Sequence, residues 1–418
     1  MTRDQNAFRS PAYGWVIVVL AALAMVGTFP GRTFGLGMIT ERLLSDSTLH
    51  LDRKSFGDMN LWATLIGALF CLPAGWLLDK WGIRTTSTLI TGLFGIVIIA
   101  MTRATDALQF AILITLTRGL GQSALSVVSI SMTGKWFRNR LPLATGVYSF
   151  LVSLGFAGAF VWGRSQSELE WRVLWFELGA ILLFVLAPIF ALFVRSAPNS
   201  PQELSAEEDV GIETDFSLVE ALATPAFWMF GIATSFYGLV SSGTSLFNES
   251  LLTDQGFDKK AYYDLMSMTP FVGFAANLIT GWMATQVRIN LLASTALGLV
   301  AAGLLSFPFV RTFPALVAYA ITMGWAGGMI TVLFFTIWAK LYGRSQLGRI
   351  QGVAQMLTVF ASGMGPKVLG DVKVGYGSYL PAIVSLGLIA FALAVSVAFA
   401  PVPRRKFERS PVVESISS

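Results

Sequence analysis

The stretch Gly75-Trp76-Leu77-Leu78-Asp79-Lys80-Trp81-Gly82-Ile83-Arg84 decides the fold of this chain. It is a short, charged turn broken by glycine, and it joins two apolar runs at 56–78 and 85–101. Each run approaches the ~20 residues that a helix needs to cross the hydrocarbon core of a bilayer. The sequence therefore predicts a helical hairpin in a membrane, with the basic residues of its turn on the cytoplasmic side.

A weaker copy of this turn occurs half a chain later. The segment Gly281-Trp282-Met283-Ala284-Thr285-Gln286-Val287-Arg288 repeats the pattern 206 residues after Gly75, and the same offset relates Gly146 to Gly352. Duplicated halves that face each other are typical of transporters that work by alternating access. We expect an N-terminal six-helix bundle at 1–195, a flexible cytoplasmic linker at 196–217, and a C-terminal six-helix bundle at 218–418.

The composition excludes an ordinary soluble protein. Of the 418 residues, 54% are hydrophobic and only 13% are charged, whereas charged residues make up about a quarter of a soluble domain. The predicted fold is an all-α membrane protein with twelve transmembrane helices in two pseudo-symmetric bundles. The twelve apolar runs lie at 14–38, 56–78, 85–104, 107–133, 142–164, 171–194, 226–250, 262–284, 290–310, 314–338, 349–370 and 378–400.

Basic residues indicate the orientation. An even number of spans puts both termini on one side, and lysine and arginine are in excess in the loops of that side, for example at Lys80, Lys135 and Arg344. By the positive-inside rule this side is cytoplasmic. The net charge of +5 then reflects topology rather than nucleic-acid binding. We expect a monomeric, multi-pass protein of the plasma (inner) membrane that contacts the lipid bilayer and no nucleic acid.

The sequence offers no residues for enzymatic chemistry. It has one cysteine, Cys71, and one histidine, His50, and it lacks a glycine-rich phosphate loop. These counts leave no disulfide within the chain, no histidine and cysteine set for a metal, and no nucleophile–base pair. We therefore expect neither an enzyme, nor a cofactor, nor a metal site.

The turn at 75–84 resembles the loop signature of the major facilitator superfamily, G-x-x-x-D-[RK]-x-G-[RK]: Gly75, Asp79, Lys80 and Gly82 match it, and Arg84 supplies the final basic residue one position later than the pattern. Segments 30–35, 243–248 and 338–366 look like the branch of that superfamily that carries monocarboxylates, oxalate and formate. The resemblance implies the superfamily fold and transport of small organic acids. The chain departs from the oxalate carriers, because Asn277 and Thr358 stand where those carriers place an arginine and a lysine, so a dianion held between two cations is not expected.

Two arginines within predicted spans are the main candidates for substrate binding. Ionisable groups are costly in hydrocarbon, so each suggests a function. Arg118 lies near the middle of span four and resembles the fourth-helix arginine of the superfamily, while Arg32 lies in the outer third of span one. Either could neutralise the charge of the substrate. The alternatives are a structural cation bonded to backbone carbonyls for Arg118 and snorkelling to the interface for Arg32.

Polar and aromatic residues at helical spacing give the other candidates. Arg118, Gln122, Ser126 and Ser129 share one face of span four, and such stripes either line a cavity or hold helices together. We expect four residues of the C-terminal half to shape the substrate cavity: Tyr237, Asn277, Trp325 and Gln355.

Two carboxylates could control transport. Glu177 is the carboxylate placed deepest within a predicted span, which makes it the candidate for proton coupling; the alternative is pairing with Arg164 or Arg172. Asp79 lies at a helix end and could face the N-terminus of a helix in the other half, where a negative charge gains ~0.3 to 1 kcal/mol. Loss of that contact would bias the equilibrium between the two access states.

The sequence thus predicts a secondary active transporter that moves a small organic anion, a monocarboxylate, by alternating access. It would be a symporter if protons are its second partner. One alternative is a carrier of a neutral or aromatic solute in which the arginines are structural. A second is a membrane sensor that binds its ligand without transporting it.

Overall fold

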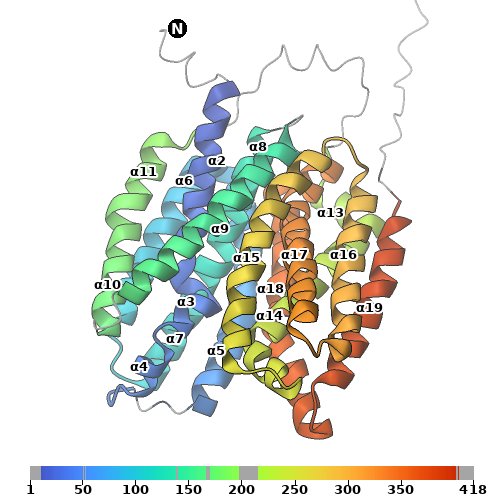
Figure 1. The fold of residues 1–418 in the computed structure, drawn as a ribbon. Helices are drawn as coiled ribbons and strands as arrows, with labels where there is room; N and C mark the ends of the chain where they lie inside the picture. The colour runs from blue at the N-terminus through green and yellow to red at the C-terminus, as the bar shows by residue number, and fades with distance from the viewer. Residues whose placement is uncertain are drawn as a thin grey trace, which may run out of the picture.

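The computed structural model describes residues 11–49, 51, 53–137, 140–165, 170–196, 215–401 and 403. Within these residues, helices cover each of the twelve expected spans. The blue-to-green helices gather into one bundle and the yellow-to-red helices into another beside it (Figure 1). Seven helices of the described part are long and apolar enough to cross a membrane. His50, most of the expected linker and the end of the chain lie outside the described residues.

The N-terminal half contains the first six spans. Span one begins as α2 and ends in short pieces, span four contains a π-helical stretch (η2), and span six contains another (η3). In order the elements are α2 (Pro11–Gly27), η1 (Phe29–Gly31), α3 (Thr33–Gly37), α4 (Thr40–Leu44), α5 (Arg53–Ala68), α6 (Cys71–Met101), α7 (Ala107–Thr117), η2 (Arg118–Leu125), α8 (Ser126–Trp136), α9 (Leu141–Ser165), α10 (Trp171–Ala180), η3 (Ile181–Leu186) and α11 (Ala187–Phe193).

The C-terminal half is more regular, since each of its spans is mostly one helix. The elements are α13 (Leu218–Leu222), α14 (Pro225–Asp254), α15 (Lys259–Met283), α16 (Ile289–Ser306), η4 (Phe307–Phe309), α17 (Phe313–Tyr342), α18 (Leu347–Tyr376) and α19 (Leu380–Ala398). Helix α13 follows residues 215–217, the described end of the expected flexible linker. This end is held in place, because Asp215 accepts a hydrogen bond from the backbone N–H of Arg344 at 2.8 Å and Phe216 donates one to the Tyr342 carbonyl at 3.0 Å.

The predicted hairpin turns at Gly82. Its φ of 78° and ψ of 168° interrupt α6, and a positive φ is a conformation that glycine adopts without the cost a side chain would add. The chain reverses there, because Gly67 before the turn and Phe94 after it both pack on residues 118–121 of span four. Spans two and three therefore run in opposite directions, as the sequence predicts.

Span one differs from the expected continuous helix over 14–38. Helix α2 ends at Gly27, a short 3₁₀ turn holds Pro30 and Gly31, and Arg32 is extended, with φ of −99° and ψ of 155°. Proline has no N–H and glycine is a poor helix former, so this pair favours a break. The break places Arg32 at a bend of the chain rather than on a helix face.

The two halves are joined at the end of the bundle that carries Asp79, which we call the latch face. Asp79 lies at the end of span two and accepts hydrogen bonds from the backbone N–H groups of Gly348 at 3.1 Å and Arg349 at 2.9 Å. Lys135 forms an ion pair with Asp79 at 2.8 Å. We call these contacts the latch. They put a carboxylate at the N-terminus of α18, as expected from the sequence, because the N–H groups there have no helical partner.

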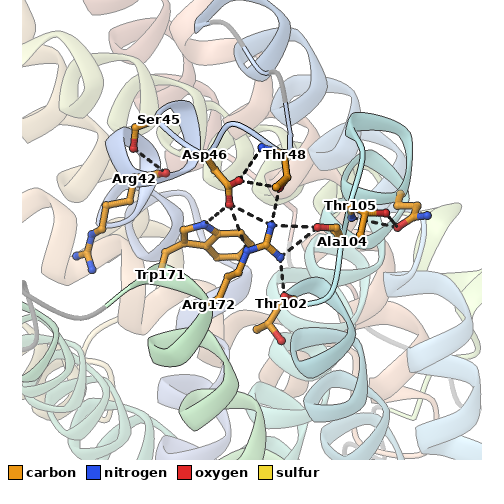
Figure 2. A network of polar contacts seen from close by, with 10 residues as sticks. Arg42, Ser45, Asp46, Thr48, Thr102, Ala104, Thr105, Trp171 and Arg172 are labelled. Carbon is orange, nitrogen blue, oxygen red and sulfur yellow. Dashed lines mark hydrogen bonds and ion pairs between the residues drawn. The ribbon is translucent and has the colours of Figure 1, made fainter.

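The opposite end of the N-terminal half is held by a second polar cluster, the clasp, shown in Figure 2. Asp46 accepts hydrogen bonds from Thr48, from the Trp171 indole and from Arg172. Arg172 also donates to the carbonyls of Thr102 and Ala104. Burial would raise the pKa of Asp46, but the hydrogen bonds and the Arg172 charge outweigh it and lower the pKa to about 2. The clasp joins the segment after α4 to the ends of spans three and six.

Candidate functional site

Arg32 has no carboxylate partner among the residues that the structure describes. Its Nε donates to Thr28 Oγ1 at 2.7 Å, and its Nη2 donates to Ser126 Oγ at 2.9 Å and to the sulfur of Met25. Among the described residues it forms no ion pair, and its Nη1 has no hydrogen bond. The side chain is only half-buried. A cation with an unused donor is therefore positioned at the break of span one.

An aromatic ring borders this arginine. The guanidinium carbon of Arg32 lies 5.4 Å from the centroid of the Phe156 ring of α9, a contact in which a cation is attracted to a ring face. One turn earlier on α9, Ser153 accepts a long hydrogen bond of 3.5 Å from Asn277 of α15. Helix α9 therefore connects the surroundings of Arg32 to the C-terminal half.

Arg118 lies close by but is enclosed. Only 1% of the residue is exposed. Its Nη1 donates to the carbonyl of Gly31 at 3.0 Å, to Thr33 Oγ1 at 3.2 Å and to Gln122 at 2.9 Å, and its Nη2 donates to Asn60 of α5. In the described part of the chain it has no carboxylate partner. Its alternative role from the sequence, a buried cation bonded to backbone carbonyl, is the arrangement present here.

The polar stripe of span four faces span one. Gln122 bonds Arg118 and Ser126 bonds Arg32, while Ser129 donates to the carbonyl of Ala21 at 2.6 Å and lies 2.7 Å from the Tyr148 hydroxyl. The π-helical stretch η2 begins at Arg118, and such stretches are common at functional sites. In this structure the stripe holds helices together and supports Arg32.

The expected cavity residues of the C-terminal half differ in exposure. Tyr237 and Trp325 are half-buried, and the Tyr237 hydroxyl lies against Gly327 of α17. Gln355 lies on the face of α18 that also carries Gly352, which packs on Cys71 of the N-terminal half. The Gln355 amide makes no hydrogen bond within the described residues. Asn277 is 3% exposed, and its Oδ1 has no donor there.

Glu177 lies apart from this site. Its side chain is exposed on α10, a helix at the edge of the N-terminal bundle (Figure 1). Arg172, one of its expected alternative partners, is instead bonded to Asp46. The side chain of Arg164, the other, lies outside the described residues. The structure does not bring Glu177 together with Arg32 and Arg118.

The remaining residues of the turn motif have separate contacts. Lys80 lies over the Trp76 ring at 4.4 Å from the centroid, and Arg84 donates to the carbonyl of Ala191 at 2.7 Å. Gly75 approaches the backbone of Gly348 in α18. The motif therefore combines a turn at Gly82, a close helix crossing at Gly75 and the latch at Asp79.

Sequence reasoning missed Asn60, Phe156 and the role of Lys135 in the latch. Asn60 carried a signal, since it is an amide within the apolar run at 56–78, and polar groups inside spans are costly. Phe156 carried none, because an aromatic residue in an apolar helix is ordinary. Lys135 was interpreted only as a marker of orientation.

Comparison with known proteins fits this architecture. Residues 12–366 match the family model of the Major Facilitator Superfamily. Over 305 residues the chain is 25% identical to monocarboxylate transporter 13 of Rattus norvegicus, a match that spans 70% of this chain and 67% of the relative. It is 22% identical to monocarboxylate transporter 2 of Mesocricetus auratus, where the match spans 64% of this chain and 59% of the relative.

Two solved structures share the fold. The human organic anion transporter MFSD10 (TETRAN) superposes with a TM-score of 0.69 at 15% identity, over 92% of this chain and 99% of that chain. The fucose:proton symporter FucP of E. coli superposes with a TM-score of 0.68 at 14% identity, over 92% and 98%. The protein described here belongs to the major facilitator superfamily and is a multi-pass membrane transporter, not an enzyme.

Proposed function

We propose that this transporter carries a small organic anion, a monocarboxylate, and that Arg32 neutralises its charge. One observation carries the proposal: the guanidinium of Arg32 is half-buried, contacts no carboxylate of the described chain and keeps Nη1 unbonded. A cation removed from water without a counter-ion is destabilised by several kcal/mol. An anionic substrate that binds at Nη1 would relieve this penalty.

The charge arrangement favours one carboxylate rather than two. Arg32 has a single free nitrogen, and the Nη atoms of Arg118 are occupied by Gly31, Thr33, Gln122 and Asn60. Asn277 and Thr358 supply no second cation in the C-terminal half. The printed names of the relatives, monocarboxylate transporters, agree with this substrate class.

The part of the substrate other than its carboxylate would contact apolar side chains near Arg32 and polar side chains of the C-terminal half. Phe156 and Met25 next to Arg32 suit a short hydrocarbon chain. Across the molecule, the half-buried Tyr237 and Trp325 and the unbonded amide of Gln355 are the proposed cavity wall. Asn277 lies at the contact between α9 and α15 and would be exposed to substrate when the two halves separate there.

Alternating access gives the latch a role. We propose that the latch face is cytoplasmic, because Lys135, Arg344 and Arg349 lie there, and that the structure is a state closed to the cytoplasm. Opening would break the contacts of Asp79 with α18. The same orientation puts both termini in the cytoplasm, and we expect a monomer in the plasma (inner) membrane.

Proton coupling through Glu177 stays a prediction. Its exposed position on α10 gives it no contact with Arg32, so coupling there would require an effect transmitted through span six. In proteoliposomes, Glu177→Gln is expected to lose accumulation driven by a pH gradient and to keep substrate exchange. Normal accumulation by this variant would remove Glu177 from the coupling mechanism and leave a proton carried with the substrate, or facilitated diffusion.

The central test is uptake by Arg32→Gln in proteoliposomes. A panel of short monocarboxylates and their neutral amides would first be screened by thermal shift on the purified protein. Arg32→Gln should lose uptake of the best carboxylate while its melting temperature stays close to that of the parent. Arg311→Gln, at an exposed position between α16 and α17, is the matched control. Normal carboxylate uptake by Arg32→Gln would instead favour a neutral substrate and structural arginines.

A further inference from the structure

We infer that Arg118 is a positioning residue, which acts by holding the break in span one and does not contact the substrate. The inference rests on the proposed role of Arg32 as the anion-binding group. It assigns Arg32 and Arg118 different tasks, although both carry the same charge and lie in neighbouring segments. Arg32 binds, and Arg118 fixes the backbone from which Arg32 projects.

The hydrogen bonds of Arg118 bracket Arg32. Its Nη1 donates to the carbonyl of Gly31 at 3.0 Å and to the hydroxyl of Thr33 at 3.2 Å, so its two partners in span one are the residues on either side of Arg32 in the chain. Its Nη2 is held by Asn60 of α5. One planar guanidinium therefore ties the bend of span one to span two, a geometry that the forked donors of arginine suit and the single ammonium of lysine does not.

The break needs such a partner. Where a helix is interrupted inside a membrane, carbonyl groups lose their helical donors and must find others within the protein. Arg32 has extended φ and ψ between η1 and α3, and the Gly31 carbonyl next to it is satisfied by Arg118. Without that bond the Gly31 carbonyl would be buried unpaired, and the bend would lose its anchor to span four.

Backbone packing adds a second restraint at the same point. A Cβ at Gly31 would lie 2.7 Å from the carbonyl oxygen of Thr117 and 3.1 Å from the Cα of Gly121. Span one therefore rests directly on η2, the π-helical stretch that begins at Arg118. Gly31 and Arg118 form one joint, in which one residue supplies the close approach and the other supplies the hydrogen bonds.

The surroundings of Arg118 separate it from any substrate. The residue is 1% exposed, its Nη atoms are engaged, and its Nε is buried without a partner among the described residues. Arg32 is half-buried and has Nη1 free. An anion bound at Nη1 of Arg32 would replace no hydrogen bond of the described residues, whereas an anion bound at the Nη atoms of Arg118 would break the joint.

The two roles predict different responses to substitution. If Arg118 supplied charge to the substrate, lysine would restore much of its function. If it positions Arg32, lysine should fail, and a change that disturbs the joint without altering charge should have the same effect. Gly31→Ala is that change, because its methyl group would collide with Thr117 and Gly121.

The experiment compares Arg32→Gln, Arg118→Lys, Arg118→Gln and Gly31→Ala in proteoliposomes, with uptake of a monocarboxylate and of its neutral amide measured for each. We expect Arg118→Lys and Gly31→Ala both to lower carboxylate uptake about tenfold or more, while the residual uptake of each keeps the parental preference for the carboxylate. Arg32→Gln should lose that preference.

Distinct results would overturn the two claims. The positioning role would be wrong, and Arg118 would be a substrate-binding charge, if Arg118→Lys takes up carboxylate at a near-normal rate. The same conclusion would follow if Arg118→Gln loses the preference for carboxylate while Gly31→Ala keeps it. Retained preference in Arg32→Gln would end the proposed function itself, whatever Arg118 does. If Arg118→Gln fails to fold, Arg118→Lys and Gly31→Ala still decide the question.

Discussion

The two copies of the repeated turn share their packing but not their charges. Gly75 packs on the first turn of α18, where a Cβ at Gly348 would lie 2.7 Å from the Gly75 carbonyl oxygen. Gly281 packs in the same way on the first turn of α9, where its Cβ would lie 2.7 Å from the carbonyl oxygen of Pro142. The offset of 206 residues relates the two contacts, because Gly281 corresponds to Gly75 and Gly348 corresponds to Pro142. Close glycine contacts therefore set both helix crossings between the halves.

Of the two copies of the turn, only the first carries the latch. Thr285 takes the place of Asp79 in the second copy, in the turn after α15, and its hydroxyl donates to the carbonyl of Trp282 at the end of that helix at 2.7 Å. Pro142 takes the place of Gly348 and has no N–H to donate. Packing therefore positions the helices in both halves, whereas a charged bond that must break on opening is built once.

At the end of the molecule opposite the latch face, the ion pairs of the two halves also differ. In the clasp, Asp46 and Arg172 are mostly buried and share several hydrogen bonds (Figure 2). In the C-terminal half, Asp254 and Lys373 form a single pair at 2.6 Å with side chains about one third exposed. Exposed pairs contribute little because water and ions screen them. Of these two described pairs, the one in the clasp is therefore the more firmly held.

The largest expected effect comes from breaking the latch. Asp79→Asn removes the ion pair with Lys135 and the negative charge at the N-terminus of α18, and it leaves at most one acceptor for two N–H groups. Charge-assisted bonds contribute about 1.5 to 3 kcal/mol each, so we expect a shift of about 3 kcal/mol, roughly a hundredfold in population, toward the state open at the latch face.

Accessibility labelling can measure this shift. In a Cys71→Ser background, a cysteine at Ala339, which packs near Gly134 at the latch face, should label faster in Asp79→Asn. A cysteine at Leu65, which packs near Gly363 closer to the other end of span two, should label more slowly. Unchanged labelling at both positions would contradict a conformational role for the latch.

The second prediction compares the mostly buried ion pair of the clasp with the more exposed pair of the C-terminal half. Arg172→Ala leaves the carbonyls of Thr102 and Ala104 without their donor and Asp46 without its counter-charge, so unfolding should become easier by about 2 kcal/mol. Lys373→Ala removes an exposed pair and should cost below about 1 kcal/mol. Thermal unfolding of the purified variants checks the difference. Equal losses would show that the clasp stabilises no more than an exposed pair.

The sequence predicted the twelve spans, a turn within 75–84 and the pairing of Asp79 with a helix N-terminus, because each has a local signal in hydropathy, glycine spacing or charge. The break at Thr28–Arg32 was missed although Pro30 and Gly31 marked it, since hydropathy stays high across the break. Which acceptors surround Arg118 could not be predicted, because Asn60 and Gly31 meet it only through tertiary packing. The ion pair of Lys135 with Asp79 is visible only once spans two and four have packed together, because 56 residues separate the two side chains in the chain.

The third prediction tests the shared packing. Gly348→Ala would meet the Gly75 carbonyl oxygen and Leu78, each at 2.7 Å, so the closed latch face should be destabilised by about 1 kcal/mol, the overpacking cost less the gain in helix propensity. Gly146→Ala meets the Asn277 carbonyl oxygen at 3.0 Å and should do less. The cysteine at Ala339 reports both. A larger effect from Gly146→Ala would mean that the α9–α15 crossing is the tighter one.

The smallest effect is expected from adding the missing acid. Thr285→Asp restores a carboxylate to the second turn but not its partners, since Pro142 offers no N–H and Leu341 stands where the offset places the equivalent of Lys135. A carboxylate at an exposed helix end with one possible donor should change the state populations by less than about 0.5 kcal/mol. Labelling at Ala339 should therefore match the parent. Slower labelling of that cysteine in Thr285→Asp would show that an acid alone creates a latch. The difference between the two copies of the turn would then be due to the single residue at this position, and not to the whole set of its partners.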